Sequence, residues 1–198
     1  GVRLEFVTDA EKFSFDYNIN IASSRRFYFF DVFVDGVMVK HFGHEDIKEA
    51  VSTLHVDLPA GTHRVCIYFP NLADARIKDF TLDDGAMIAP VARPVKLLCY
   101  GDSITAQDWP DYLAMRCFQE GFSKTAVIRR ATSGSRILRQ YDCLTYESYG
   151  LSGENRFAHE VPTDGADTVL IQQGINDIIH PVGEQVNVFR PMSDLPTV

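Results

Sequence analysis

Residues 95–117, VKLLCYGDSITAQDWPDYLAMRC, place a continuous apolar run directly before a Gly-Asp-Ser turn and a helical pattern. A strand that is apolar on both faces is typical of a parallel sheet covered on both sides. Asp108 is in position to cap the following helix, and Pro110 falls in its first turn. The stretch therefore predicts the strand, turn and helix that open an α/β domain. The helical spacing predicts one buried face, made of Trp109, Tyr112, Leu113 and Cys117.

Two later apolar runs are predicted to be further strands of the same sheet. They are TAVIRRA at residues 125–131 and DTVLIQQ at residues 167–173. Pro90 and Pro94 separate this part of the chain from the part before it, as expected of a linker or domain boundary. We therefore predict that residues 95–198 form an incomplete α/β domain with a parallel sheet.

Residues 1–90 show the two-residue period of β-strands instead. Asp35-Gly36 between two β-rich runs is a strong hairpin signal. Short strands at this spacing predict an antiparallel β-sandwich such as a jelly roll. The predicted fold class is an α+β two-domain chain, with a β-sandwich (jelly-roll-like) domain at 1–90 and the α/β domain at 95–198. The alternating apolar positions are Phe13, Phe15, Tyr17, Ile19, Ile21, Leu54, Val56, Leu58, Val65, Ile67 and Phe69.

The composition is that of a globular protein and excludes several classes of function. The net charge of −8 over 198 residues argues against nucleic acid or an anionic membrane surface as a partner. No apolar run approaches the ~20 residues of a membrane-spanning helix. None of the four cysteines belongs to a C-x-x-C pair, and nucleotide and zinc-protease motifs are missing, so we expect no metal and no cofactor. Cys66, Cys99 and Cys117 lie in apolar patterns, which predicts buried free thiols and favours a reducing, cytoplasmic compartment.

Three short polar stretches follow the predicted parallel strands, at the edge where α/β sheets bind ligands. Serine-dependent acyl transfer needs an exposed hydroxyl and donors aimed at the developing oxyanion. Ser103 supplies the hydroxyl, and its own N–H, the N–H of Gly134 and the Asn176 side chain supply three candidate donors. The ordinary alternatives are a helix-capping serine, a turn glycine and an Asx-turn asparagine.

These stretches resemble the conserved blocks of the SGNH (GDSL-like) hydrolases. GDSIT at 101–105 and GIND at 174–177 match two of the blocks, and ATSGS at 131–135 is a looser match to the glycine block between them. The resemblance implies that Ser103 is the nucleophile and that Gly134 and Asn176 complete the oxyanion hole. Residues 1–90 also resemble the jelly-roll domain that precedes the hydrolase domain in some carbohydrate esterases of this family.

The sequence departs from the family where its base should be. The family takes its histidine from an Asp-x-x-His block near the end of the domain, and no such block occurs here. We therefore expect a C-terminally truncated chain that lacks its catalytic Asp/His segment. His180, directly before Pro181, is interpreted as a substrate-binding residue, with a role as general base as the alternative. Asp102 and Asp177 are expected to brace the loops around Ser103 and Asn176.

The leading hypothesis is a serine esterase or acylhydrolase that removes a small acyl group, such as acetyl, from a carbohydrate or other small ester. The alternative is a carbohydrate-binding module attached to an inactive or incomplete hydrolase remnant. The aromatic stretch at residues 27–30 is interpreted as sandwich core, with an exposed platform for sugar stacking as its alternative. The oligomeric state is not predicted.

Overall fold

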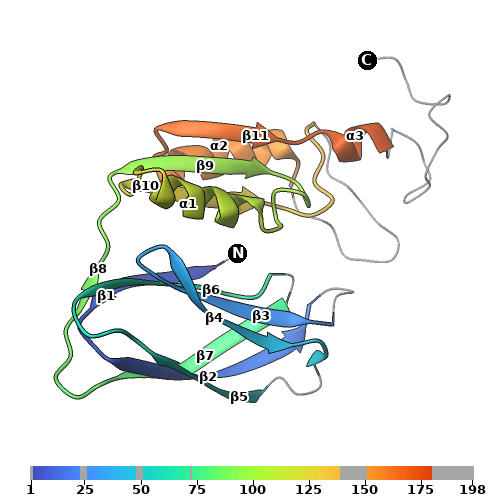
Figure 1. The fold of residues 1–198 in the computed structure, drawn as a ribbon. Coiled ribbons are helices and arrows are strands. Elements are labelled where there is room, and N and C mark those ends of the chain that lie inside the picture. Colours follow the sequence, from blue (N-terminus) through green and yellow to red (C-terminus); the bar gives the residue numbers. More distant parts are fainter. Residues whose placement is uncertain (1, 23–25, 48–50, 72, 139–150, 180–198) are drawn as a thin grey trace. The chain divides into compact units, whose positions relative to one another are not determined.

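The structure is a computed structural model that describes residues 2–22, 26–47, 51–71, 73–138 and 151–179. Its strands and helices are drawn in Figure 1. The chain divides into two compact units, Gly1–Ala92 and Arg93–Val198, and each unit is described here by itself.

Among the described residues, the first unit consists of two antiparallel sheets. One sheet has the strand order β4-β3-β6-β1-β8, and the other has the order β5-β2-β7. The strands are β1 (Arg3–Thr8), β2 (Lys12–Ile21), β3 (Tyr28–Val34), β4 (Val37–His44), β5 (Val51–Asp57), β6 (His63–Tyr68), β7 (Ala73–Leu82) and β8 (Ile88–Pro90). The β-rich character predicted for this part of the chain is confirmed.

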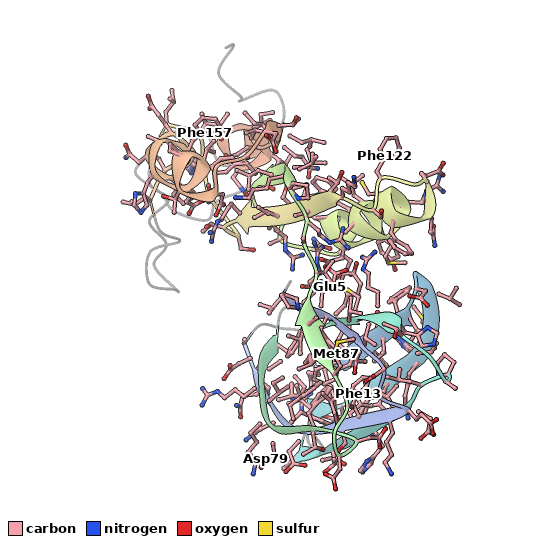
Figure 2. The ribbon with its side chains drawn as sticks, turned by 90° about the vertical axis from the view of Figure 1, so that its left-hand side faces the viewer. Glu5, Phe13, Asp79, Met87, Phe122 and Phe157 are labelled. Atoms are coloured by element: carbon pink, nitrogen blue, oxygen red, sulfur yellow. The ribbon has the colours of Figure 1, made fainter. Side chains whose placement is uncertain are left out.

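The two-residue period of the sequence places the core of this unit between the two sheets. Phe13 on β2, which Figure 2 labels, is buried together with Phe15, Tyr17 and Ile19, whereas Ile21 at the strand end is 58% exposed. Apolar residues of both sheets belong to one cluster. Alternating residues of a strand point to opposite faces, so the buried set of β2 meets that of the facing sheet.

The predicted hairpin is present between β3 and β4. Asp35 and Gly36 connect these strands with φ of 49° and 82°. Two consecutive positive φ angles are what a type I′ turn requires, and such a turn matches the twist of the flanking strands. The Asp35 carboxylate also accepts a hydrogen bond from the Arg64 N–H at 2.9 Å, which ties the turn to β6.

The aromatic stretch before and within β3 is divided between the two faces of its sheet. Tyr28 and Phe30 are buried in the core. Phe27 is 41% exposed, and Phe29 stacks on His41 with ring centroids 4.4 Å apart. The interpretation of the whole stretch as core is therefore wrong for Phe27 and Phe29, because consecutive strand residues alternate between faces.

The second unit contains a small parallel sheet with the strand order β10-β9-β11. Its strands lie where the apolar runs predict them. The elements are β9 (Val95–Gly101), α1 (Trp109–Gln119), β10 (Thr125–Ala131), α2 (Gly153–Asp164), β11 (Thr168–Gln172) and α3 (Ile175–Ile179). Figure 1 shows β9 in the middle of the three strands.

Helices α1 and α2 cover opposite faces of β9. Cys99 packs in a cluster with Ala114 of α1 and Val127 of β10. The next residue, Tyr100, points to the other face, where its ring meets Phe157 of α2 edge-on at 5.3 Å. The continuous apolar run of β9 is explained by this cover, because a strand packed on both faces needs apolar residues on both.

Two details of α1 differ from the prediction. Tyr112 is 63% exposed, whereas Pro110 and Ala114 are buried, so the buried face is centred between Trp109 and Ala114 and excludes Tyr112. Asp108 occupies the N-cap position, but its side chain makes no capping hydrogen bond, because its backbone (φ −84°, ψ −14°) is already helical. Pro110 lies in the first turn, as predicted.

Candidate active site

The sheet register brings the three predicted blocks to one edge. Gly101, the last residue of β9, pairs with Ala131 at the end of β10 and with Gln172 at the end of β11. Each strand end is followed closely by one predicted site residue: Ser103 lies two residues after Gly101, Gly134 three after Ala131, and Asn176 four after Gln172. Since the strands are parallel, all three segments leave the sheet at its carboxyl edge, which is where α/β sheets bind ligands.

The turn that carries Ser103 is built by its neighbours. The Asp102 side chain is 1% exposed, and its Oδ1 accepts a hydrogen bond from the Ile104 N–H at 3.0 Å. The Ala106 N–H donates to the Asp102 carbonyl at 3.0 Å. Ser103 is half-buried between these bonds. Asp102 thus braces the turn as expected, and its carboxylate is occupied by the backbone.

Ser103 is not a helix cap. Helix α1 begins at Trp109, and Asp108 holds the N-cap position. A separate hydrogen-bonded turn lies between Ser103 and the start of α1. This observation removes the ordinary capping explanation for Ser103 and leaves its hydroxyl without a structural role in α1.

Gly134 lies in a tight turn after β10. Its φ is 74°, and the Ser135 N–H donates to the Thr132 carbonyl at 3.1 Å. Glycine adopts this left-handed conformation at no steric cost. The interpretation of Gly134 as a turn glycine is therefore correct, and the turn lies at the carboxyl edge of the sheet.

Asn176 lies on the short helix α3 and is 6% exposed. Its Nδ2 donates to the Ser135 carbonyl at 3.1 Å, which uses one of the two N–H hydrogens of the amide. The carboxylate of Asp177 accepts the Ile137 N–H at 3.0 Å. These bonds hold the segment after β11 against the segment after β10, so Asp177 braces the loop as expected.

The first and third segments are tied together as well. Thr105 Oγ1 donates to Gln172 Oε1 at 2.9 Å. The packing at Gly101 is so close that a Cβ there would lie 2.2 Å from the Gln172 carbonyl oxygen. The structure thus brings Ser103, Gly134 and Asn176 onto three mutually bonded segments at one sheet edge.

Two side chains that the sequence did not predict, Gln173 and Arg156, take part in this network. Gln173 Nε2 donates to Ser135 Oγ at 2.6 Å and to the Arg136 carbonyl at 3.1 Å. Arg156, on α2, is 7% exposed and also donates to Ser135 Oγ. Helix α2 begins after the N-cap residue Ser152 and ends at the left-handed Gly165, and these two residues are the sequence signal for this helix. Pro162 in its last turn obscures that signal, because proline is unusual inside a helix.

The predicted site residue His180 and the fourth cysteine, Cys143, lie outside the described ranges. His180 follows the last described residue, and Cys143 falls in the undescribed stretch 139–150. Cys66 and Cys99 are buried free thiols, as predicted, whereas Cys117 is only half-buried, so the prediction of burial is wrong for it. Burial raises the pKa of the Cys66 and Cys99 thiols to about 11. Within the described ranges, no group of acidic, histidine or cysteine side chains is arranged to hold a metal ion, and no helix is long and apolar enough to span a membrane.

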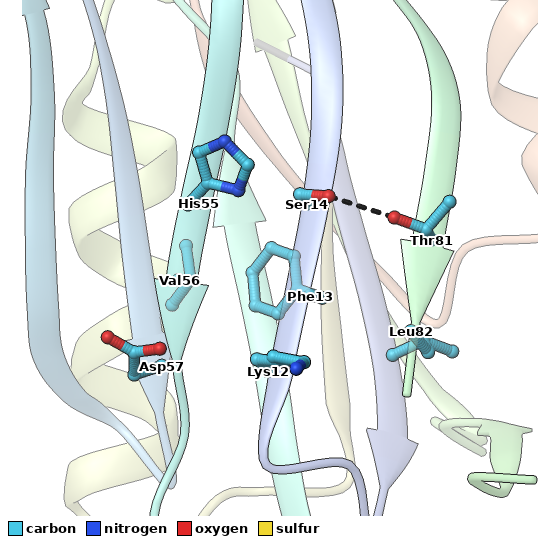
Figure 3. A pocket seen from close by; sticks show the side chains of 8 residues that line it. All are labelled: Lys12, Phe13, Ser14, His55, Val56, Asp57, Thr81 and Leu82. Atoms are coloured by element: carbon cyan, nitrogen blue, oxygen red, sulfur yellow. Dashed lines mark hydrogen bonds between the residues drawn. The ribbon is translucent and has the colours of Figure 1, made fainter. Parts of the chain in front are cut away.

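A hollow of about 280 Å³ lies over β2, β5 and β7 in the first unit. Figure 3 shows its lining, in which Ser14 and Thr81 share a 2.8 Å hydrogen bond beside His55. Because Ser14 already uses this bond and none of the predicted site residues lines the hollow, we do not assign catalysis to it.

No family model and no curated protein matches the chain. Solved structures do match. A salicylyl-acyltransferase from a tetracycline biosynthetic pathway is 28% identical, with a TM-score of 0.50 over 66% of this chain and 40% of that one. A family two carbohydrate esterase from Clostridium thermocellum, solved with cellohexaose, is 18% identical, with a TM-score of 0.59 over 90% of this chain and 60% of that one.

A carbohydrate esterase family 2 enzyme from Corynascus thermopiles (Myceliophthora fergusii), solved with a carbohydrate-binding domain, is 17% identical, with a TM-score of 0.53 over 95% of this chain and 62% of that one. The chain therefore spans between 40% and 62% of the length of these three proteins. These likenesses show that the chain shares its fold with part of each of these proteins.

Proposed function

We propose that this chain carries the nucleophile and oxyanion hole of a serine ester hydrolase that removes a small acyl group from a carbohydrate or another small ester. The observation that carries the proposal is the sheet register: Gly101 pairs with both Ala131 and Gln172, so the three blocks leave the sheet at one level. A metal or cofactor has no part in this mechanism.

In the proposed reaction, Ser103 Oγ attacks the ester carbonyl carbon while a base takes its proton. The carbonyl oxygen becomes an oxyanion that accepts hydrogen bonds from the N–H groups of Ser103 and Gly134 and from the second N–H of Asn176. Collapse of the intermediate breaks the bond to the alcohol, which leaves with the proton from the base. Water then repeats the sequence on the acyl-enzyme and releases the acid.

Asp102 does not serve as that base in our proposal. Asp102 is 1% exposed, and its carboxylate accepts a hydrogen bond from the Ile104 N–H, so the carboxylate points into the backbone turn and away from solvent. His180 is proposed to line the substrate pocket, because it follows Asn176 by four residues.

The substrate class rests on the comparisons. Two of the similar structures are carbohydrate esterases, and one of these was solved with cellohexaose. The acyltransferase likeness, at 28% identity, supports chemistry at an acyl group. We further propose that residues 1–90 form a jelly-roll-like domain and residues 95–198 an SGNH-type domain, as in carbohydrate esterases with this arrangement.

A fluorophosphonate probe tests the proposal in the full-length protein. We expect the probe to label Ser103, to fail with Ser103→Ala, and to label Ser123→Ala like the parent, because Ser123 is an exposed loop serine outside the site. Hydrolysis of an activated acetyl ester should follow the same pattern. Glycan binding without any labelling would contradict the proposal and favour the binding-module alternative.

A further inference from the structure

A buried arginine joins two of the three segments of the candidate active site. Arg156 lies on α2, is 7% exposed, and its guanidinium carbon lies 4.9 Å from the centre of the Tyr100 ring. This position puts a positive charge beneath the carboxyl edge of the sheet. Burying a guanidinium costs free energy unless its N–H groups are paired. The hydrogen-bond partners of Arg156 therefore indicate its structural role.

One nitrogen of Arg156 bridges the two segments. Its Nη2 donates to the Gly101 carbonyl at 3.1 Å and to Ser135 Oγ at 3.0 Å. The other terminal nitrogen, Nη1, pairs with Glu160 Oε2 at 3.2 Å, one helical turn further along α2. Each Nη has two hydrogens at fixed angles, so a planar guanidinium can hold all three acceptors at once.

Both bridged groups are close in the chain to the proposed reacting groups. Gly101 stands two residues before Ser103, and Ser135 directly follows Gly134. A single nitrogen atom of Arg156 thus joins the Gly101 carbonyl to the Ser135 hydroxyl, beside the backbone bond from the Thr132 N–H to the same carbonyl at 3.2 Å.

We propose that Arg156 is a positioning residue that sets the spacing between the Ser103 nucleophile and the Gly134 oxyanion donor. The inference rests on the proposed function, since it concerns the same site. Arg156 acts through the Gly101 carbonyl and the Ser135 hydroxyl and does not itself touch the substrate. A displacement of about 1 Å between reacting groups can cost roughly 10²-fold in rate.

The substitution Arg156→Lys tests this role in the full-length enzyme. Lysine keeps the positive charge, but it lacks the planar guanidinium whose two terminal nitrogens point to the bridged segments and to Glu160. We expect kcat for an activated acetyl ester and the rate of fluorophosphonate labelling at Ser103 to fall by about 10²-fold, with KM changed by less than about threefold. Arg130→Lys is the matched control, because Arg130 pairs with Asp164 of the same helix on the surface.

A second variant decides the matter if Arg156→Lys does not fold, as judged by thermal unfolding. Ser135→Ala removes only the hydroxyl that Arg156 and Gln173 share. We expect it to fold and to lower kcat by about tenfold at constant KM, because Arg156 Nη2 then holds only the Gly101 carbonyl.

The outcomes separate this inference from the proposed function. If the parent protein is not labelled at Ser103, the proposed function fails. If the parent is labelled and folded Arg156→Lys or Ser135→Ala reacts at the parent rate, the proposed function stands and the positioning role of Arg156 is overturned. A rise in KM at unchanged kcat would also overturn it, because the arginine would then contribute to substrate binding.

Discussion

The substitution Gly101→Ala tests whether the close approach of β9 and β11 shapes the turn that carries Ser103. An added Cβ would lie 2.2 Å from the Gln172 carbonyl oxygen and 2.2 Å from Thr105 Oγ1. Non-bonded carbon and oxygen atoms stay roughly 3.3 Å apart, so a shift of about 1 Å is required. The φ of Gly101 is not in the left-handed region, so the whole effect is steric.

Neither of the two clashing atoms can move by this distance without a cost in free energy. One clashing atom is backbone of β11, and the other belongs to a buried threonine whose hydroxyl donates to Gln172. Overpacking of this kind costs about 1–3 kcal/mol of unfolding free energy. Because Ser103 is two residues away, we expect a displacement near 1 Å at its hydroxyl and a loss of about 10²-fold in kcat/KM.

The assay combines urea unfolding with hydrolysis of an activated acetyl ester. Gly121→Ala is the control, because Gly121 has a φ of 88° and no neighbouring atom within 4 Å of an added Cβ. That variant should lose about 1–2 kcal/mol through backbone strain alone and keep its activity. Parent-like stability and activity of Gly101→Ala would refute the reasoning, since the two strands would then separate freely.

Three further outcomes are expected. Asn176→Ala should lower kcat by about 10²–10³-fold with little change in KM, as steady-state kinetics will show, and an effect on KM alone would assign it to ground-state binding. The Asp35 carboxylate accepts a hydrogen bond from the His63 ring, which raises the pKa of His63 above 6.5. While Asp35 is ionised, the pair stabilises the fold fully below pH 6.5 and loses this contribution as the pH rises through the raised pKa of His63. NMR titration should find the His63 pKa lower in Asp35→Asn, and an unchanged value would contradict the pairing. Burial raises the pKa of Cys66 to about 11, so iodoacetamide at pH 8 should modify this thiol only after unfolding, as mass spectrometry can check.

The sequence predicts best where one local rule decides the structure. The Asp35-Gly36 turn has few alternatives once two β-rich runs flank it. The apolar run 95–100 is unambiguous for a similar reason, because only a strand covered on both faces needs it. The same holds for the short blocks at the sheet edge, whose positions follow directly from where three parallel strands end.

Prediction fails where tertiary contacts decide. Tyr112 fits the helical spacing of α1, yet Ala114 is buried in its place, because the sheet meets α1 on a face rotated away from the tyrosine. Arg156 reads in the sequence as one more surface arginine. Only the packing of α2 on Tyr100 turns its guanidinium inward, and that packing leaves no periodic signal.

The middle position of β9 has a consequence for synthesis of the chain. Its partner β10 follows after a single helix, whereas β11 emerges only after roughly 36 further residues, which takes a few seconds at about 5–20 residues per second. Throughout this interval one edge of an apolar strand offers unpaired N–H and C=O groups to any nascent neighbour. Translation speed between codons 131 and 168 should therefore influence the yield of soluble protein, independently of the stability of the finished fold.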